Sequence, residues 1–232
     1  MSQYHKIGII AAMDIEIDTL KERLENCVIK EMAGGKYYSG KIGTHEVVLL
    51  KCGIGKVSAA IGAQVMIDYY HVDAIINTGC AGGLEKSLQV GDTVLASNTV
   101  EWDMDITPLG DPRGLINGLN KVYLEADMTL VNELKEVIEK VSNVKVGLVV
   151  SGDQFICRDS QREIILGSFP EALCAEMEGA AIGHTCVQNN VPYCVIRSMS
   201  DTADGNSTMS YPEFSKMASE KSAEYLYQFL TK

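Results

Sequence analysis

The chain has 232 residues, with 20 basic and 31 acidic side chains and a formal net charge of -11. This length is typical of one large domain or at most two, and the acidic excess disfavours binding to nucleic acid or to an anionic membrane surface. A mean hydropathy of +0.03 with 22% charged residues is typical of a globular protein and excludes disorder over most of the length.

Cysteine and histidine spacing disfavours both a disulfide framework and a metal site. The 7 cysteines include no C-x-x-C pair, and the 4 histidines show neither H-E-x-x-H nor H-x-H spacing. The cysteines are better explained as small buried thiols in a reducing compartment. No apolar run reaches the roughly 18 residues of a membrane span, and residues 1–13 do not resemble a signal peptide. We therefore expect a cytoplasmic protein without a structural metal.

The first half of the chain alternates between predicted strands and helices. An apolar strand is expected at residues 7–13, followed by a helix at 14–24 with Asp14 at its N-cap. Residues 28–51 predict antiparallel strands separated by glycine turns, and residues 56–70 predict a helix.

The second half continues this alternation and adds a long loop. A buried strand at 72–76 is expected to run into a glycine-rich loop at 77–83, and residues 103–124 predict a long surface loop. Further strands are expected at 90–100, 144–150, 172–175 and 192–199, and helices at 127–141, 179–188 and from Ser210 to about Leu230. Without repeats or a linker, this pattern predicts one α/β domain whose mostly parallel sheet is covered on both faces.

Acidic residues follow several of the predicted strands. They are Glu16, Asp153, Asp201 and the pair Glu176 and Glu178. Ligands of open α/β sheets bind outside the carboxyl ends of the strands, so these positions predict a shared acidic cleft. Taken singly, each residue could equally be a helix cap or a solvated side chain.

The segment Glu176-Met177-Glu178 is the sharpest signal. A carboxylate accepts two hydrogen bonds at once, which suits the cis-diol of a ribose, although a structural pair at a helix start is the alternative. Arg197 lies within an apolar strand, so its guanidinium requires a carboxylate or a ligand as partner.

Two other motifs fail on inspection. The segment GIGKV at 53–57 lacks the first glycine and the Ser/Thr of a phosphate loop, and we expect a tight turn that opens a helix. Gly152-Asp153 lacks the G-x-S-x-G pattern of a nucleophile elbow.

Six ordered motifs resemble those of a known family. They are IGIIAAMDIE at 7–16, GIGKV at 53–57, INTGCAGG at 76–83, VSGDQFI at 150–156, AEMEGAAI at 175–182 and IRSMSD at 196–201. With them the chain resembles, over nearly its whole length, the nucleoside phosphorylase and nucleosidase superfamily and, within it, the 5′-methylthioadenosine/S-adenosylhomocysteine nucleosidases. The resemblance implies one α/β domain with a curved mixed β-sheet flanked by helices, and a homodimer. It further implies hydrolysis of the bond between adenine and ribose in these adenine nucleosides, without a metal or organic cofactor.

The same resemblance implies roles for individual residues. Glu16 would activate the water, with Arg197 and Cys80 near it, and Asp201 would protonate the leaving adenine with support from Ser200. Glu178 would bind the ribose hydroxyls beside Glu176 and Met177. The remaining contacts would come from Phe155, Ile156, Ala81 and Gly82 at the purine and from Met13, Ile54 and Tyr211 at the sugar and its 5′ substituent.

The sequence departs from the family pattern at two places and leaves other functions open. Cys80 replaces the usual serine and is a weaker hydrogen-bond partner for the water, and the loop at 103–124, which closes the site and meets the partner subunit in the family, matches poorly. One alternative is a purine nucleoside phosphorylase, although Ala11–Glu16 contains no arginine for phosphate. The others are a nucleosidase for aminodeoxyfutalosine and a nucleoside-binding protein that has lost catalysis.

Overall fold

The computed structural model describes residues 3–201 and 207–232, with the backbone alone for 207–213. The N-terminal half contains a strand, two short helical turns, a strand meander, a helix and two longer strands: β1 (Lys6–Ala11), η1 (Asp14–Glu16), α1 (Asp18–Glu22), β2 (Glu25–Met32), β3 (Gly35–Ile42), β4 (His45–Lys51), α2 (Lys56–Asp68), β5 (Ala74–Gly83) and β6 (Thr93–Glu101). The C-terminal half alternates helices with strands: η2 (Thr107–Leu109), β7 (Leu124–Glu125), α3 (Met128–Ile138), β8 (Val144–Ser151), α4 (Asp159–Ser168), β9 (Ala172–Glu176), α5 (Gly179–Asn189), β10 (Tyr193–Asp201) and α6 (Ser207–Leu230).

The described strands form one ten-stranded sheet in the order β10-β6-β8-β9-β5-β1-β4-β3-β2, with β7 beside β6. Strand β10 also pairs with β5, so β5, β10, β6, β8 and β9 close into a ring. Five strand pairings are parallel and five antiparallel, which confirms a curved mixed sheet. The expectation of a mostly parallel sheet was wrong, because ring closure and the β2–β4 meander require antiparallel pairs.

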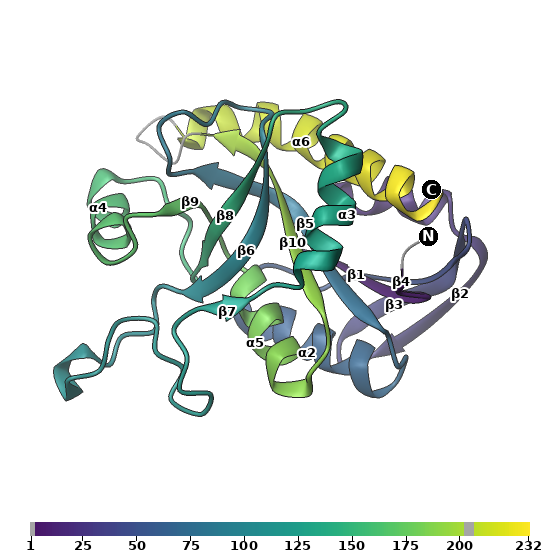
Figure 1. The fold of residues 1–232 in the computed structure, drawn as a ribbon. Coiled ribbons are helices and arrows are strands. Elements are labelled where there is room, and N and C mark those ends of the chain that lie inside the picture. Colours follow the sequence, from purple (N-terminus) through teal and green to yellow (C-terminus); the bar gives the residue numbers. More distant parts are fainter. Residues whose placement is uncertain (1–2, 202–206) are drawn as a thin grey trace.

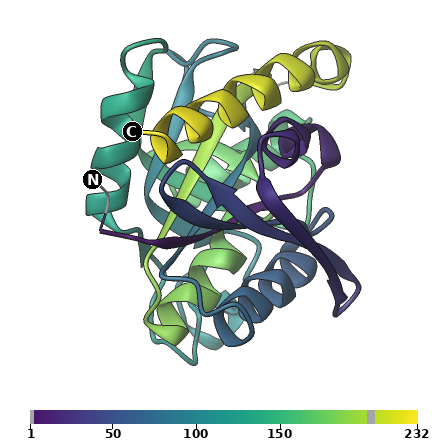
Figure 2. The same cartoon turned by 90° about the vertical axis from the view of Figure 1, so that its right-hand side faces the viewer.

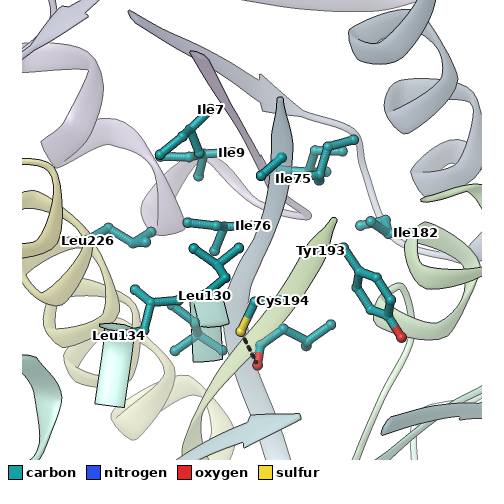
Figure 3. Packing of buried hydrophobic residues seen from close by; sticks show 14 of the residues in the cluster. Ile7, Ile9, Ile75, Ile76, Leu130, Leu134, Ile182, Tyr193, Cys194 and Leu226 are labelled. Carbon is teal, nitrogen blue, oxygen red and sulfur yellow. Dashed lines mark hydrogen bonds between the residues drawn. The ribbon is translucent and has the colours of Figure 1, made fainter. Parts of the chain in front are cut away.

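Helices cover both faces of the sheet, as expected from its continuously apolar strands. Figures 1 and 2 show α3 and α6 on one side and α2 and α5 on the other. Within the core, Ile76 lies on the side of Leu226, and the preceding Ile75 lies on the side of Ile182 (Figure 3). This alternation follows from the two-residue period of a strand. Within residues 3–201 and 207–232, no helical segment combines the length and the hydrophobicity that a membrane span requires.

Several predicted elements differ from the observed ones. Residues 77–83 belong to strand β5 rather than to a loop, because β10 and β9 supply hydrogen-bond partners along them. The predicted helix at 14–24 breaks at Ile17 into η1 and α1, and Asp14 pairs with Lys21 and Lys51 instead of capping a helix. Helix α4 was not predicted. The loop between β6 and β7 projects from the body as expected (Figure 1), and it includes the short η2.

Candidate active site

A cavity of about 310 Å³ opens where the carboxyl ends of β1, β5, β9 and β10 converge. This is where ligands bind in α/β sheets. The cavity is lined by Ala12, Met13, Glu16, Ile54, Cys80, Ala81, Gly82, Phe155, Ala175, Glu176, Met177, Glu178, Ser200 and Asp201. Among the described residues, its charged lining groups are the carboxylates of Glu16, Glu176, Glu178 and Asp201, so the predicted acidic cleft is confirmed for four of its five residues.

Glu16 enters the cavity from the turn that follows β1. Its side chain is only 2% exposed, and its Oε2 accepts hydrogen bonds from the backbone N–H groups of Ala12 and Met13, both at 2.9 Å. Burial raises the pKa of Glu16, while the nearby charge of Arg197 opposes that rise. A raised pKa makes the carboxylate a stronger base, which favours a role as general base.

Strand β5 passes close to Glu16 because it has a glycine at the point of contact. The backbone N–H of Cys80 donates to Glu16 Oε1 at 3.3 Å, and the Cys80 thiol lies 3.7 Å from the same oxygen. A Cβ on Gly79 would overlap Arg197 Nη1 and lie 2.7 Å from Glu16 Oε1. Only glycine therefore allows the carboxylate and the guanidinium to approach this strand together.

Arg197 lies on β10 beneath the cavity rather than in its lining, and it is 1% exposed. Its guanidinium forms an ion pair with Glu176, lies 3.5 Å from Glu178 Oε2 and donates to Asn77 Oδ1. Burial would lower the pKa of Arg197, but the surrounding carboxylates outweigh burial and raise it. Arg197 is thus a permanent cation that offsets buried negative charge, and its predicted carboxylate partner is confirmed.

The two carboxylates of the Glu176-Met177-Glu178 segment have different surroundings. Glu176 binds Arg197, Ser151 Oγ and the backbone N–H groups of Glu178 and Gly179, the latter pair at 2.8 to 3.0 Å. Its hydrogen-bond capacity is therefore used within the protein, and it holds the start of α5.

Glu178 keeps more of its capacity for a ligand. Its Oε1 accepts one backbone hydrogen bond, from Gly55 at 2.9 Å. Burial and the neighbouring charge of Glu176 raise the pKa of Glu178 to about 7, against the opposing effect of Arg197. Because Gly55 is its one backbone donor among the described residues, the ionised carboxylate of Glu178 can accept further hydrogen bonds from the hydroxyl groups of a bound molecule.

Asp201 ends strand β10 and is 3% exposed. The Ser200 hydroxyl donates to Asp201 Oδ2 at 3.0 Å. Asp201, Phe155, Ile156 and Gln154 also line a small pocket of about 30 Å³. Its other lining residues, Gly82, Ala175, Glu176 and Met177, are shared with the main cavity. An aromatic ring beside a buried acid suits a flat heterocycle that must accept a proton.

The structure brings most of the predicted site residues together, with three exceptions. Arg197 lies below the cavity, Ile156 lines only the small pocket, and the side chain of Tyr211 falls outside the described residues. Asp153 is not part of the acidic cleft, because it binds the backbone N–H of Lys56 at the start of α2. This was the alternative considered for each acidic residue.

Sequence reasoning missed Ala12 and Ala175 in the cavity wall and the N–H of Gly55 as a donor to Glu178. Small apolar residues leave no recognisable signal in a sequence. The predicted turn at 53–57 is confirmed, since Gly55 precedes α2 with a φ of 104°. Its glycines were a signal for close backbone approach, but not for the residue approached. Among the described side chains, no group of three or more His, Cys, Asp or Glu could hold a metal ion.

Comparison with known proteins places this geometry in context. Residues 6–231 match the model of the phosphorylase superfamily. The chain is 45% identical over 222 residues to a 5′-methylthioadenosine/S-adenosylhomocysteine nucleosidase from Exiguobacterium, covering 94% of each protein.

Two solved structures are also similar. The same type of nucleosidase from S. pneumoniae, with the transition-state inhibitor MT-ImmA, superposes with a TM-score of 0.92 at 39% identity, covering 97% of this chain and 98% of that one. A futalosine hydrolase from Helicobacter pylori superposes with a TM-score of 0.92 at 31% identity, covering 97% of each chain.

Proposed function

The chain belongs to the phosphorylase superfamily and, within it, to the 5′-methylthioadenosine/S-adenosylhomocysteine nucleosidases, and we propose how its residues divide the work. The enzyme hydrolyses the N-glycosidic bond of these nucleosides and releases adenine. Breaking this bond builds positive charge on the sugar and negative charge on the purine. Anionic groups are needed near the ribose and a proton donor near the base.

Glu16 is the general base that removes a proton from the attacking water. Its burial and its three backbone donors hold the carboxylate in one orientation. The Cys80 thiol beside Glu16 Oε1 contacts the same water more weakly than a hydroxyl would. The positive charge of Arg197 opposes the rise in the pKa of Glu16 and Glu178 that burial causes, and so favours their ionised forms.

Glu178 binds the ribose hydroxyls, and Met177 packs against the sugar, next to Glu176. Asp201 protonates the leaving adenine, and the Ser200 hydroxyl donates a hydrogen bond to the Asp201 carboxylate. Phe155, Ile156 and the backbone of Ala81 and Gly82 hold the purine. Met13, Ile54 and Tyr211 surround the sugar and the 5′ substituent.

The negative charge of the cavity is the observation that favours hydrolysis over phosphorolysis. Its described lining includes Glu16, Glu176, Glu178 and Asp201 and no cation. The nearby guanidinium of Arg197 is already paired with two of these carboxylates. A phosphate dianion would therefore meet uncompensated negative charge, whereas a water molecule would not.

The reaction is tested by incubating the protein with 5′-methylthioadenosine, with and without inorganic phosphate, and identifying both products. We expect free adenine and free 5-methylthioribose at a rate independent of phosphate. Formation of the ribose 1-phosphate would establish a phosphorylase, and binding without adenine release would establish a nucleoside-binding protein.

A second substrate deserves the same assay. The similarity to a futalosine hydrolase supports aminodeoxyfutalosine as an alternative adenine nucleoside. A higher kcat/KM on that compound than on 5′-methylthioadenosine would reassign the preferred 5′ substituent and leave the chemistry unchanged.

The surface and the cysteines support two proposals about the protein's state in the cell. Val57 and Ile61, 71% and 45% exposed, lie one helical turn apart on α2 beside the exposed Ile54 of the cavity wall. An apolar face at the cavity mouth is suited to burial between two copies of the chain, so the enzyme is a homodimer.

All 7 cysteines are free thiols, which suits the cytoplasm and can be checked by cell fractionation.

A further inference from the structure

A cluster of charged groups lies beside the active site without lining the cavity. Lys56 Nζ lies 2.6 Å from Asp103 Oδ1 and 3.0 Å from Glu101 Oε2, and the three side chains are only 13 to 17% exposed. His184 Nδ1 lies 2.9 Å from the other oxygen of Glu101. These groups come from three elements and one turn: the start of α2, the end of β6, the turn that follows β6, and α5.

Three residues, Lys56, Asp153 and Asp103, are linked into a closed cycle by two backbone N–H groups and one ion pair. The Lys56 N–H donates to Asp153 Oδ1 at 2.8 Å, the Asp153 N–H donates to Asp103 Oδ2 at 2.9 Å, and Asp103 binds the Lys56 ammonium. This cycle ties the start of α2 to the ends of β6 and β8, which are neighbouring strands with Glu101 opposite Ser151. Helix α2 has no side-chain cap from its preceding residue Gly55, and Asp153 instead supplies an acceptor for the Lys56 N–H in its first turn.

Gly55, the residue next to this cycle, forms a hydrogen bond with the active site. Gly55 directly precedes Lys56, and its N–H is the backbone donor to Glu178 Oε1. Gly55 has a left-handed φ of 104°, and a Cβ there would lie 3.0 Å from Asp153 Oδ1. The direction of its N–H therefore depends on how firmly Lys56 and Asp153 hold the turn.

We propose that Lys56 is a positioning residue: its ammonium group, held by Asp103 and Glu101, fixes the Gly55 N–H that orients Glu178 toward the ribose hydroxyls. The proposal rests on the assignment of Glu178 to those hydroxyls. Lys56 itself does not line the cavity. Its effect is on the discrimination between a riboside and a 2′-deoxyriboside, which a purely structural ion pair would not change.

The test compares kcat and KM for 5′-methylthioadenosine and its 2′-deoxy analogue in the parent, Lys56→Met and Lys56→Arg. A loosened hydrogen bond to a charged group corresponds to roughly a tenfold loss. We expect Lys56→Met to lose about tenfold in kcat/KM on the riboside, mainly through KM, and less than about twofold on the 2′-deoxy analogue. Lys56→Arg keeps the charge and should restore most of the discrimination.

The matched control is Lys145→Met, which removes another ion-paired lysine, bound to Glu85 and Ser87 away from the cavity. It should leave the discrimination at the parent value. If Lys56→Met does not fold, Glu101→Gln weakens the hold on the ammonium while keeping the shape, and it should shift the discrimination in the same direction by a smaller factor.

Different results separate the two levels of the proposal. A parent enzyme that releases adenine equally from both nucleosides would contradict the assignment of Glu178, and with it the role of Lys56. A discriminating parent whose folded Lys56→Met variant is unchanged, or loses equally on both substrates, would overturn the role of Lys56 alone.

Discussion

Glu16 shows how one side chain can be both deeply buried and chemically available. Its oxygens are held by backbone N–H groups from two directions, from the turn after β1 and from β5. The carboxylate therefore does not need to reorganise when a proton moves to it. Fixed groups of this kind are more effective than solvated ones because the cost of orientation is met during folding.

The first prediction follows from this geometry. Glu16→Gln keeps the size of the side chain and an oxygen for the Ala12 and Met13 N–H groups, but an amide cannot take the proton from water. We expect nearly unchanged substrate binding and a turnover reduced at least about a hundredfold, measured by adenine release. The control is Asp14→Asn, an exposed neighbour paired with Lys21 and Lys51, which should retain activity. Near-parental turnover in Glu16→Gln would remove Glu16 from the mechanism.

At this scale the sequence could predict which residue types gather, but not which contacts each one makes. Glu176 and Glu178 are both glutamates and lie two residues apart, so the sequence alone does not distinguish their roles. In the fold one carboxylate binds backbone and Arg197, and the other accepts a single backbone bond from Gly55. The backbone partner of Glu178 lies 123 positions away in the chain, and local spacing does not contain such a contact.

Among the elements, β5 shows why local propensity can fail. Three glycines in Asn77–Gly83 predict a loop, since glycine is disfavoured in strands. The strand persists because β10 pairs along it and β9 pairs with its end. Gly79 is needed for the close approach of Arg197 and Glu16. A residue that disfavours the strand is therefore present because the active site requires it.

Two helical glycines allow a matched test of packing. A Cβ on Gly183 in α5 would lie 2.7 Å from the Tyr193 ring and 2.8 Å from Thr99 Oγ1, whereas a Cβ on Gly167 in α4 would meet nothing within 4 Å. We expect Gly183→Ala to lower the free energy of unfolding by about 1–3 kcal/mol through overpacking. Gly167→Ala should raise it by about 0.5–1 kcal/mol, because alanine favours the helix.

Urea unfolding of both variants measures these changes. Equal stability of the Gly183→Ala variant and the parent would mean that α5 moves away from β10 without cost. Its packing would then be looser than the contacts with Tyr193 indicate.

For the whole molecule, the sequence resemblance was sufficient to predict a single curved mixed sheet, while the residue pattern alone predicted too many parallel pairings. Periodicity identifies strands, but the partner of a strand depends on distant segments. β1, for example, pairs with β4 and β5 rather than with β2.

The exposed apolar face of α2 leads to a prediction about assembly. The parent should have a mass about twice 25.2 kDa by light scattering, and Val57→Glu combined with Ile61→Glu should be monomeric because charge is placed in the interface. Ile29→Glu, at a residue that is 56% exposed on the edge strand β2, serves as the control and should leave the dimer intact. A monomeric parent would contradict the proposal.

The closure of the ring by β10 has a consequence for the order in which the molecule can be made. β10 is the last strand that the structure describes, and it carries both Arg197 and Asp201. During synthesis, the edges of β5 and β6 that face β10 remain unpaired until residue 201 has left the ribosome. The nascent chain thus gains the closed ring and these two charged groups together, and a chain terminated before β10 would have neither.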